Sequence, residues 1–183
     1  MTSPYLVPVA RLLRDVPSVT EVSFVAPFDE ERELAPRGPA ETDVWPDAAV
    51  RVSLRLESYV GGLRARGRVG APWHGICRRC SVEVTGECDV AVAERFVAHA
   101  DPADEEAYPI DGDVIDLRHL VRDAVLLDLP LAPLCRDDCR GLCPLCGTDR
   151  NEAACECQPA TDPRWATLDE LRFTDLPDDV GGV

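Results

Sequence analysis

Nine cysteines dominate the chemistry available to this chain of 183 residues. Eight of them form four closely spaced pairs, and the ninth, Cys88, stands alone. The pairs are Cys77 with Cys80, Cys135 with Cys139, Cys143 with Cys146, and Cys155 with Cys157. Two thiolates separated by two residues can hold one metal ion from a tight turn, and structural Zn²⁺ takes four such ligands in a tetrahedron. The pairs therefore predict one or two structural zinc ions.

The four pairs can be combined in more than one way. Two tetrahedral sites would use all eight paired cysteines. The first of these sites is local in sequence and comprises Cys143, Cys146, Cys155 and Cys157. The second needs two distant segments to meet and comprises Cys77, Cys80, Cys135 and Cys139. A single site in the style of a zinc ribbon, built from Cys77, Cys80, Cys143 and Cys146, is the alternative.

The remaining residues do not suggest catalysis. A catalytic zinc keeps an open coordination position and often uses histidine, but the three histidines, His74, His99 and His119, have no ligand-like spacing. The chain also lacks a phosphate-binding glycine loop and a nucleophile motif. We therefore expect a protein that is not an enzyme and has no small-molecule substrate. Free or redox-active thiols are the alternative use of the cysteines, although no thioredoxin-like pattern supports disulfide exchange.

The sequence also indicates a compartment. No segment approaches the roughly 20 apolar residues of a membrane-spanning helix, and Pro4, Pro8 and Pro17 interrupt the first residues where a secretory signal would be apolar. We expect a cytoplasmic protein with no membrane partner. In a reducing cytosol, clustered cysteines bind metal more often than they form disulfides.

The net charge of −15 disfavours binding of the whole chain to a polyanion. A contact with nucleic acid would need a segregated basic surface. Alternating apolar residues from Val50 predict a strand, and Gly61-Gly62 predicts a two-residue hairpin turn that pairs Val60 with Leu63. This register gathers five arginines on the outer face around a single carboxylate, Glu57. They are Arg51, Arg55, Arg64, Arg66 and Arg68, and Arg78 and Arg79 extend the set.

The surface formed by these arginines is called the arginine face below. It is either a solvated strand surface or a contact surface for RNA phosphate or for an acidic protein patch. Around it we expect an α+β fold, in which an antiparallel sheet or partly open barrel spans about 20–98. One main helix near 116–128 begins at the N-cap Asp116, and residues 99–113 form an acidic loop. Cys88 lies in the inward register and is predicted to be a buried apolar residue, not a ligand.

The predicted organisation has two parts. Residues 1–133 form the sheet and the helix, and residues 134–183 form a cysteine-rich, zinc-stapled segment with an acidic tail. We expect them to make one integrated domain.

Several runs resemble the cysteine-rich branch of the YceD family. One is Ile115-Asp116-Leu117 after an acidic loop, and another is the helix end Leu129-Pro130-Leu131-Ala132-Pro133-Leu134-Cys135. A third is Cys139-Arg140-Gly141-Leu142-Cys143-Pro144-Leu145-Cys146-Gly147, followed by Asp162-Pro163-Arg164. The resemblance covers most of the chain. One departure is that Thr148-Asp149-Arg150-Asn151 stands where the family often has Asn-Leu-Asn.

The resemblance implies a bacterial, non-enzymatic factor that supports accumulation of 23S rRNA and large ribosomal subunit biogenesis. Its partner would be large-subunit rRNA or a ribosomal protein of the precursor particle, bound through the arginine face. All eight paired cysteines match motif positions of the family. A thiol-based redox or zinc sensor, or a zinc reservoir linked to ribosome synthesis, is the alternative function.

Overall fold

The computed structural model describes residues 3–28, 42–98, 107–157 and 164. The chain folds into two compact units, Met1–Cys139 and Arg140–Val183. Cys135 and Cys139 therefore belong to the unit that contains the sheet. The acidic tail, and parts of both acidic loops, lie outside the described residues.

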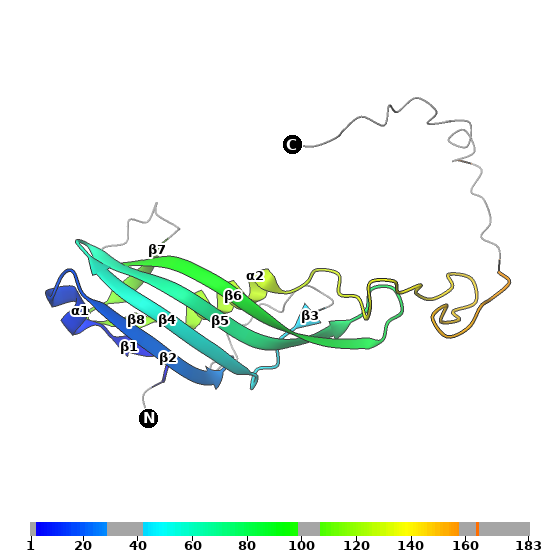
Figure 1. Ribbon diagram of the computed structural model, residues 1–183, viewed down its shortest axis with the longest axis horizontal. Coiled ribbons are helices and arrows are strands. Elements are labelled where there is room, and N and C mark those ends of the chain that lie inside the picture. Colours follow the sequence, from blue (N-terminus) through cyan, green and yellow to red (C-terminus); the bar gives the residue numbers. More distant parts are fainter. Residues whose placement is uncertain (1–2, 29–41, 99–106, 158–163, 165–183) are drawn as a thin grey trace. The chain divides into compact units, whose positions relative to one another are not determined.

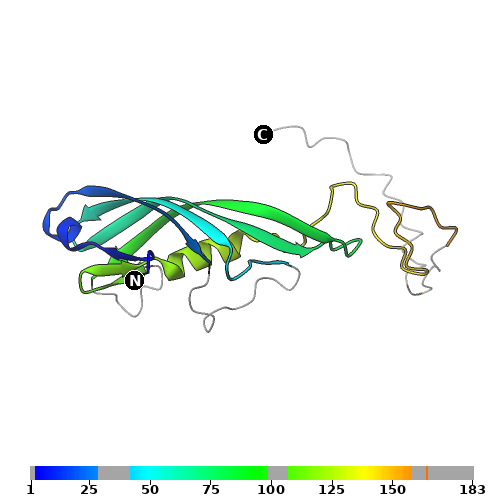
Figure 2. The ribbon, with the colours of Figure 1, turned by 90° about the horizontal axis from the view of Figure 1, so that it is seen from below.

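The first unit is a half-barrel built on one curved sheet (Figures 1 and 2). Its strand order is β1-β8-β7-β6-β5-β4-β2, and β3 pairs with β5. The strands are β1 (Leu6–Pro8), β2 (Val19–Pro27), β3 (Thr42–Asp43), β4 (Ala49–Tyr59), β5 (Gly62–Ile76), β6 (Glu83–Val97), β7 (Ala107–Asp111) and β8 (Val114–Asp116). The helices are α1 (Ala10–Arg14) and α2 (Arg118–Asp128).

The sheet is mixed and not wholly antiparallel. Strand β7 pairs in parallel with the end of β6, where Arg95 lies opposite Ala107. The sequence predicted a loop over residues 99–113. This prediction was wrong for residues 107–111, which form β7. A parallel pair cannot be joined by a tight hairpin turn, so this pairing is not expected from local sequence signals.

The hairpin between β4 and β5 has a different register from the predicted one. Val60 and Gly61 form the turn, so Tyr59 pairs with Gly62 and Glu57 with Arg64. Gly61 takes the positive φ of 100° that the turn requires. Gly62 is the first residue of β5. Only glycine fits there, because a Cβ would lie 2.2 Å from the carbonyl oxygen of Phe96 on β6.

This shift is two residues long, so each side chain keeps its predicted face. Val60 is the exception: it was predicted to point inward, but as a turn residue it is 91% exposed. Ser58 is buried and accepts a hydrogen bond from the Ser18 N–H at 2.8 Å.

Helix α2 packs against the inner face of the sheet (Figure 2). Leu120, Val121 and Val125 are buried there with the inward side chains of the strands. The N-cap is Leu117 and not Asp116. Asp116 nevertheless accepts a hydrogen bond from the Arg118 N–H at 2.9 Å and so pairs the first helical amide.

The unpaired cysteine, Cys88, lies in the hydrophobic core. Cys88 is only 3% exposed and donates its thiol proton to the Ala71 carbonyl at 3.2 Å, which confirms its prediction as a buried residue. Neither helix in the described parts of the chain is long and apolar enough to cross a membrane.

Candidate metal centres and the arginine face

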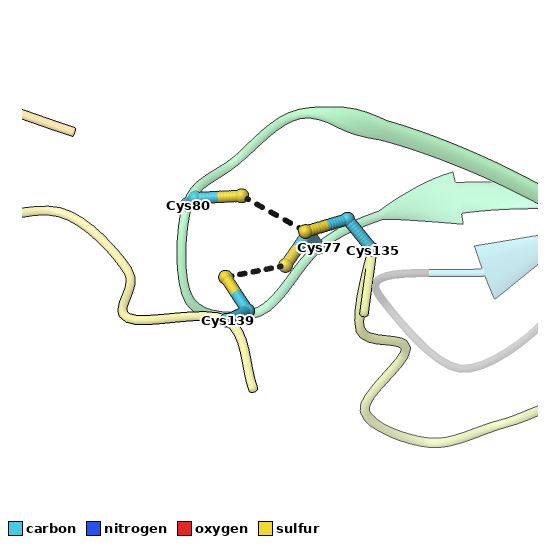
Figure 3. A group of neighbouring side chains, drawn as sticks. All are labelled: Cys77, Cys80, Cys135 and Cys139. Atoms are coloured by element: carbon cyan, nitrogen blue, oxygen red, sulfur yellow. Dashed lines mark hydrogen bonds between the residues drawn. The ribbon is translucent and has the colours of Figure 1, made fainter. Parts of the chain in front are cut away.

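The first group of four cysteines lies where the β5–β6 turn meets the segment after α2 (Figure 3). We call it the hairpin site; it comprises Cys77, Cys80, Cys135 and Cys139. The sulfurs of Cys77 and Cys139 are 3.9 Å apart, and those of Cys80 and Cys135 are 3.6 Å apart. A tetrahedron with Zn–S bonds of about 2.3 Å has edges of about 3.8 Å. The spacing suits a four-thiolate metal site, and no disulfide links these cysteines.

The β5–β6 turn presents the first two thiols through its backbone. The Cys77 N–H donates to the Val82 carbonyl at 2.8 Å, and the Ser81 N–H donates to the Cys77 carbonyl at 2.9 Å. Ser81 has a positive φ of 60°. This tight turn carries Cys77 and Cys80, whose sulfurs approach those of Cys139 and Cys135, as Figure 3 shows.

The segment after α2 is fixed to that turn by two arginines. The Arg78 N–H donates to the Pro133 carbonyl at 2.9 Å, and the Arg79 guanidinium donates to the Cys139 carbonyl at 2.8 Å. Arg79 was predicted as part of the arginine face, but its guanidinium supports the hairpin site. Cys77, Cys80 and Cys139 are buried, so three of the four sulfurs are shielded from water.

The second group lies wholly in the second unit and is called the local site. It comprises Cys143, Cys146, Cys155 and Cys157, whose ligand atoms all lie within 4.8 Å of one another. The eight paired cysteines therefore fall into the two groups of the two-site prediction. The zinc-ribbon alternative does not match. Its first pair, Cys77 and Cys80, lies with Cys135 and Cys139, and its second pair, Cys143 and Cys146, lies with Cys155 and Cys157.

The run Thr148-Asp149-Arg150-Asn151 shapes the return of the chain to Cys155. The Asp149 carboxylate accepts from the Asn151 N–H at 2.8 Å, and the Asn151 amide oxygen accepts from the Arg140 N–H at 2.7 Å. Leu142 and Asp149 form an isolated antiparallel bridge. These bonds close a short loop that brings the last two cysteines to the first two.

At least one thiol in each group has a lowered pKa and is disposed to ionise. Burial alone raises the pKa of Cys77, but backbone N–H groups of Cys135 and Cys80 donate to its sulfur and lower the pKa to about 6. In the local site, the Thr148 hydroxyl and N–H donate to Cys146 and lower its pKa to about 6. Donors to a thiolate favour the charged form.

Other thiols in the groups resist ionisation. Desolvation and the neighbouring sulfurs of Cys139 and Cys80 raise the pKa of Cys135 to about 12. The hydrogen bond to Cys146, followed by desolvation, raises the pKa of Cys157 to about 12. Four thiolates this close repel one another, and a divalent cation would remove that repulsion. The donor set of both groups therefore fits a metal ion, and soft thiolates favour zinc.

The predicted arginine face is exposed, but its charge is not uniform. Arg51, Arg55, Arg64, Arg66 and Arg68 are all exposed on the outer side of β4 and β5. Arg51 pairs with Glu87 at 2.7 Å. Arg68 pairs with Asp89 at 2.9 Å. Sequence reasoning missed these two carboxylates, because they lie on β6 and face the arginines only once the sheet order is known.

The positive charge is concentrated near the turn of the β4–β5 hairpin. Arg66 lies opposite Arg55, and Arg64 lies opposite Arg95 on β6. Arg55 donates to Glu57 at 2.8 Å and lies 3.9 Å from Glu21. Among the described residues, no carboxylate lies within ion-pair distance of Arg64 or Arg66. These two guanidiniums are the available cations at this end of the face.

The half-barrel and the two groups of four thiols define a cysteine-rich β protein that could hold two metal ions. Residues 65–172 match the sequence model of the family described as large ribosomal RNA subunit accumulation protein YceD. The chain belongs to the YceD family. No solved structure matches it significantly.

Three relatives illustrate the range of the family. An uncharacterized protein of Mycobacterium tuberculosis is 36% identical over 177 residues, which cover 93% of this chain and 83% of the relative. The uncharacterized protein YlbN of Bacillus subtilis is 26% identical over 148 residues, 79% of this chain and 86% of its own. The chloroplastic YCED homolog 1 of Arabidopsis thaliana, named for large ribosomal RNA subunit accumulation, is 30% identical over 70 residues, 38% of this chain and 22% of its own.

Proposed function

We propose that this protein is a non-enzymatic factor that supports accumulation of 23S rRNA and biogenesis of the large ribosomal subunit, and that the arginine face contacts rRNA phosphates. The family name supports the first part. The observation that carries the second is the pair Arg64 and Arg66, exposed on one face without a carboxylate within ion-pair distance among the described residues. Arg55 and Arg95 lie opposite them across the sheet.

Local charge can outweigh the acidic total of −15. Exposed charges are largely screened beyond a Debye length of about 8–10 Å at physiological salt. A phosphate at the hairpin turn would therefore interact mainly with the nearby guanidiniums. Arginine also presents planar donors that can contact a phosphate through two hydrogen bonds.

The two metal sites support a structural role in this proposal. Each group supplies four thiol sulfurs within 4.8 Å, which fills a tetrahedral zinc and leaves no open position for substrate or water. We assign one Zn²⁺ to each group. In the hairpin site the ion would join the β5–β6 turn to the segment after α2, and in the local site it would close the second unit.

The test uses purified precursor particles and ultraviolet crosslinking with the full-length protein. Arg64→Glu combined with Arg66→Glu should abolish crosslinks to rRNA, whereas Arg14→Glu, an exposed arginine on α1, is the matched control. Crosslinks to a ribosomal protein alone would contradict the RNA contact. Unchanged rRNA crosslinks in the double variant would do the same.

The exposure of the local site favours one alternative function. Cys146 and Cys157 are exposed and Cys155 is half-buried, so this site is open to oxidants. A thiol-based sensor or zinc reservoir would release zinc from the local site on treatment with mild peroxide. A structural site would keep its zinc under conditions that oxidise small free thiols, and a metallochromic dye would distinguish the two outcomes.

A further inference from the structure

Strand β6 has an edge that is only partly used. Residues Glu83–Val97 all pair with β5, but β7 covers the other side of only Arg95, Phe96 and Val97. Among the strands of the described residues, none pairs with the free side of β6 before Arg95. Backbone N–H and C=O groups along such an edge can accept a further strand.

A groove runs beside this open edge. Its volume is about 300 Å³, and it lies between β6 and α2. Its apolar walls are Val90 and Val92 on the strand and Leu120, Ala124 and Leu127 on the helix. Leu127 is 88% exposed, so the groove presents apolar surface to solvent. An open edge beside a helix is the arrangement in which some domains bind an extended peptide as an added strand.

The polar groups of this groove are acidic. Glu94, Asp123 and Asp128 line it. Glu94 lies on the inward side of β6 opposite Ala65 and is half-buried. The Asp123 carboxylate accepts a hydrogen bond from the Tyr108 hydroxyl at 2.9 Å. Burial raises the pKa of Tyr108, and this carboxylate raises it further. No arginine lies within ion-pair distance of Glu94, Asp123 or Asp128 among the described residues.

We infer that the β6 edge and the α2 groove bind an extended, basic segment of another protein as an added β-strand. The backbone of that segment would pair with β6 upstream of Arg95. Its side chains alternate between two faces, so apolar side chains at alternate positions enter the groove beside Ala124 and Leu127. Lysine or arginine side chains reach Glu94, Asp123 and Asp128.

Charge excludes two other occupants. The segments of this chain outside the described residues are mostly acidic, including 99–106 and the tail after 165, and would meet carboxylates in the groove. A second copy paired through the same edge would bring only its own strand 83–94, which contains no lysine or arginine to meet the carboxylates of the groove. This inference concerns a different surface from the arginine face and does not depend on RNA binding.

The test begins with a displayed library of random nine-residue peptides, selected on the full-length zinc-loaded protein. We expect enrichment of peptides in which lysine or arginine accompanies apolar residues at alternate positions. The best peptide is then made in two forms, N-methylated on either set of alternate residues. Only one set of amides can face β6, so one form should lose at least about tenfold in affinity and the other should retain it.

The protein side of the test uses Asp128→Arg, with Asp111→Arg on the β7–β8 hairpin as the matched charge control. Asp128→Arg should weaken the peptide at least about tenfold, and Asp111→Arg should leave it unchanged. Zinc content and circular dichroism confirm that both variants fold. The inference is overturned if no basic peptide is enriched, if both N-methylated forms bind equally, or if Asp128→Arg binds normally. Light scattering that shows a dimer lost in Ala91→Pro would assign the edge to a second copy instead.

Discussion

Ser81 and Gly147 occupy equivalent positions in two turns of the same construction. Each directly follows a Cys-x-x-Cys pair, with φ angles of 60° and 74°. Each donates its N–H to the carbonyl of the first cysteine of its pair, at 2.9 Å in both turns. The hairpin site and the local site therefore use one backbone turn to present two sulfurs, although only one of them uses glycine.

This equivalence predicts that Ser81→Gly stabilises the protein. A positive φ destabilises a non-glycine residue by about 1–2 kcal/mol. Replacement by glycine removes this strain but lowers stability by about 0.5–1 kcal/mol, because glycine gains more freedom in the unfolded chain. We expect a gain of about 0.5–1 kcal/mol in the free energy of unfolding of the zinc-loaded protein, measured by denaturant titration. Gly147→Ser is the reciprocal control and should destabilise by a similar amount. A loss of stability in Ser81→Gly would refute the equivalence.

The proposed metal content predicts two zinc ions per chain, measured by mass spectrometry under native conditions. Cys77→Ser and Cys143→Ser should each reduce the content to one ion, because each removes a ligand from a different group. Cys88→Ala is the control and should keep both, since Cys88 is a buried residue outside the groups. Structural zinc contributes on the order of 10 kcal/mol to folding in small domains, so chelation should destabilise both sites. A single ion in the unmodified chain would contradict the assignment.

The pKa shifts predict how the metal-free chain responds to pH. The pKa values of Cys77 and Cys146 fall from an ordinary value of 9.0 to about 6 in the folded state. Such a lowered pKa contributes stability that is present above pH 9 and is lost as the pH falls through 6. We expect the free energy of unfolding of the reduced, metal-free chain to rise with pH across this window. Thiolate absorbance should titrate near pH 6, and Cys77→Ser with Cys146→Ser should remove that step.

The arginine face predicts a difference in salt dependence between paired and available arginines. Each phosphate contact contributes about 0.7–0.9 to the slope of log affinity against log salt concentration. Arg66→Ala should therefore lower the slope for RNA binding by about that amount. Arg68→Ala should lower it less, because Asp89 already pairs with Arg68 at 2.9 Å. Equal effects of the two substitutions would show that the ion pair does not decide which arginine is available.

The N-terminal residues predict a purely structural effect. The Tyr5 hydroxyl donates to the Pro27 carbonyl at 2.7 Å, and its ring packs edge-on against Phe24. Tyr5→Phe should lower the free energy of unfolding by about 1 kcal/mol, because the carbonyl loses its partner. Tyr5→Ala should cost about 3–5 kcal/mol by leaving a cavity. Tyr59→Phe at the half-exposed end of β4 is the control and should change stability by less than about 0.5 kcal/mol.

The sequence predicted features that depend on local alternation. The period of two placed Arg64 and Arg66 outward and Cys88 inward, and the structure agrees because an even shift of register does not exchange the faces of a strand. Counting pairs predicted the two cysteine groups as one of two possible arrangements, and the structure matches that arrangement and not the zinc ribbon. Helix α2 followed from its apolar spacing, within two residues at its start.

Features that depend on distant contacts were missed. The turn was placed at Gly61-Gly62, because the sequence does not reveal that Gly62 must lie against the Phe96 carbonyl of β6. Strand β7 was read as loop, since it is short, contains Pro109 and pairs in parallel. The partners Glu87 and Asp89 required the order of strands in the sheet.

The two metal sites differ in when they can form. Cys77 and Cys139 are 62 residues apart in the chain, so their thiols meet only after β6 and α2 have taken their places between them. The four cysteines of the local site lie within Cys143–Cys157 and need no such preparation. During synthesis or refolding, the local site can therefore capture its ion as soon as its own segment is free. Occupation of the hairpin site instead marks the moment at which the half-barrel is complete.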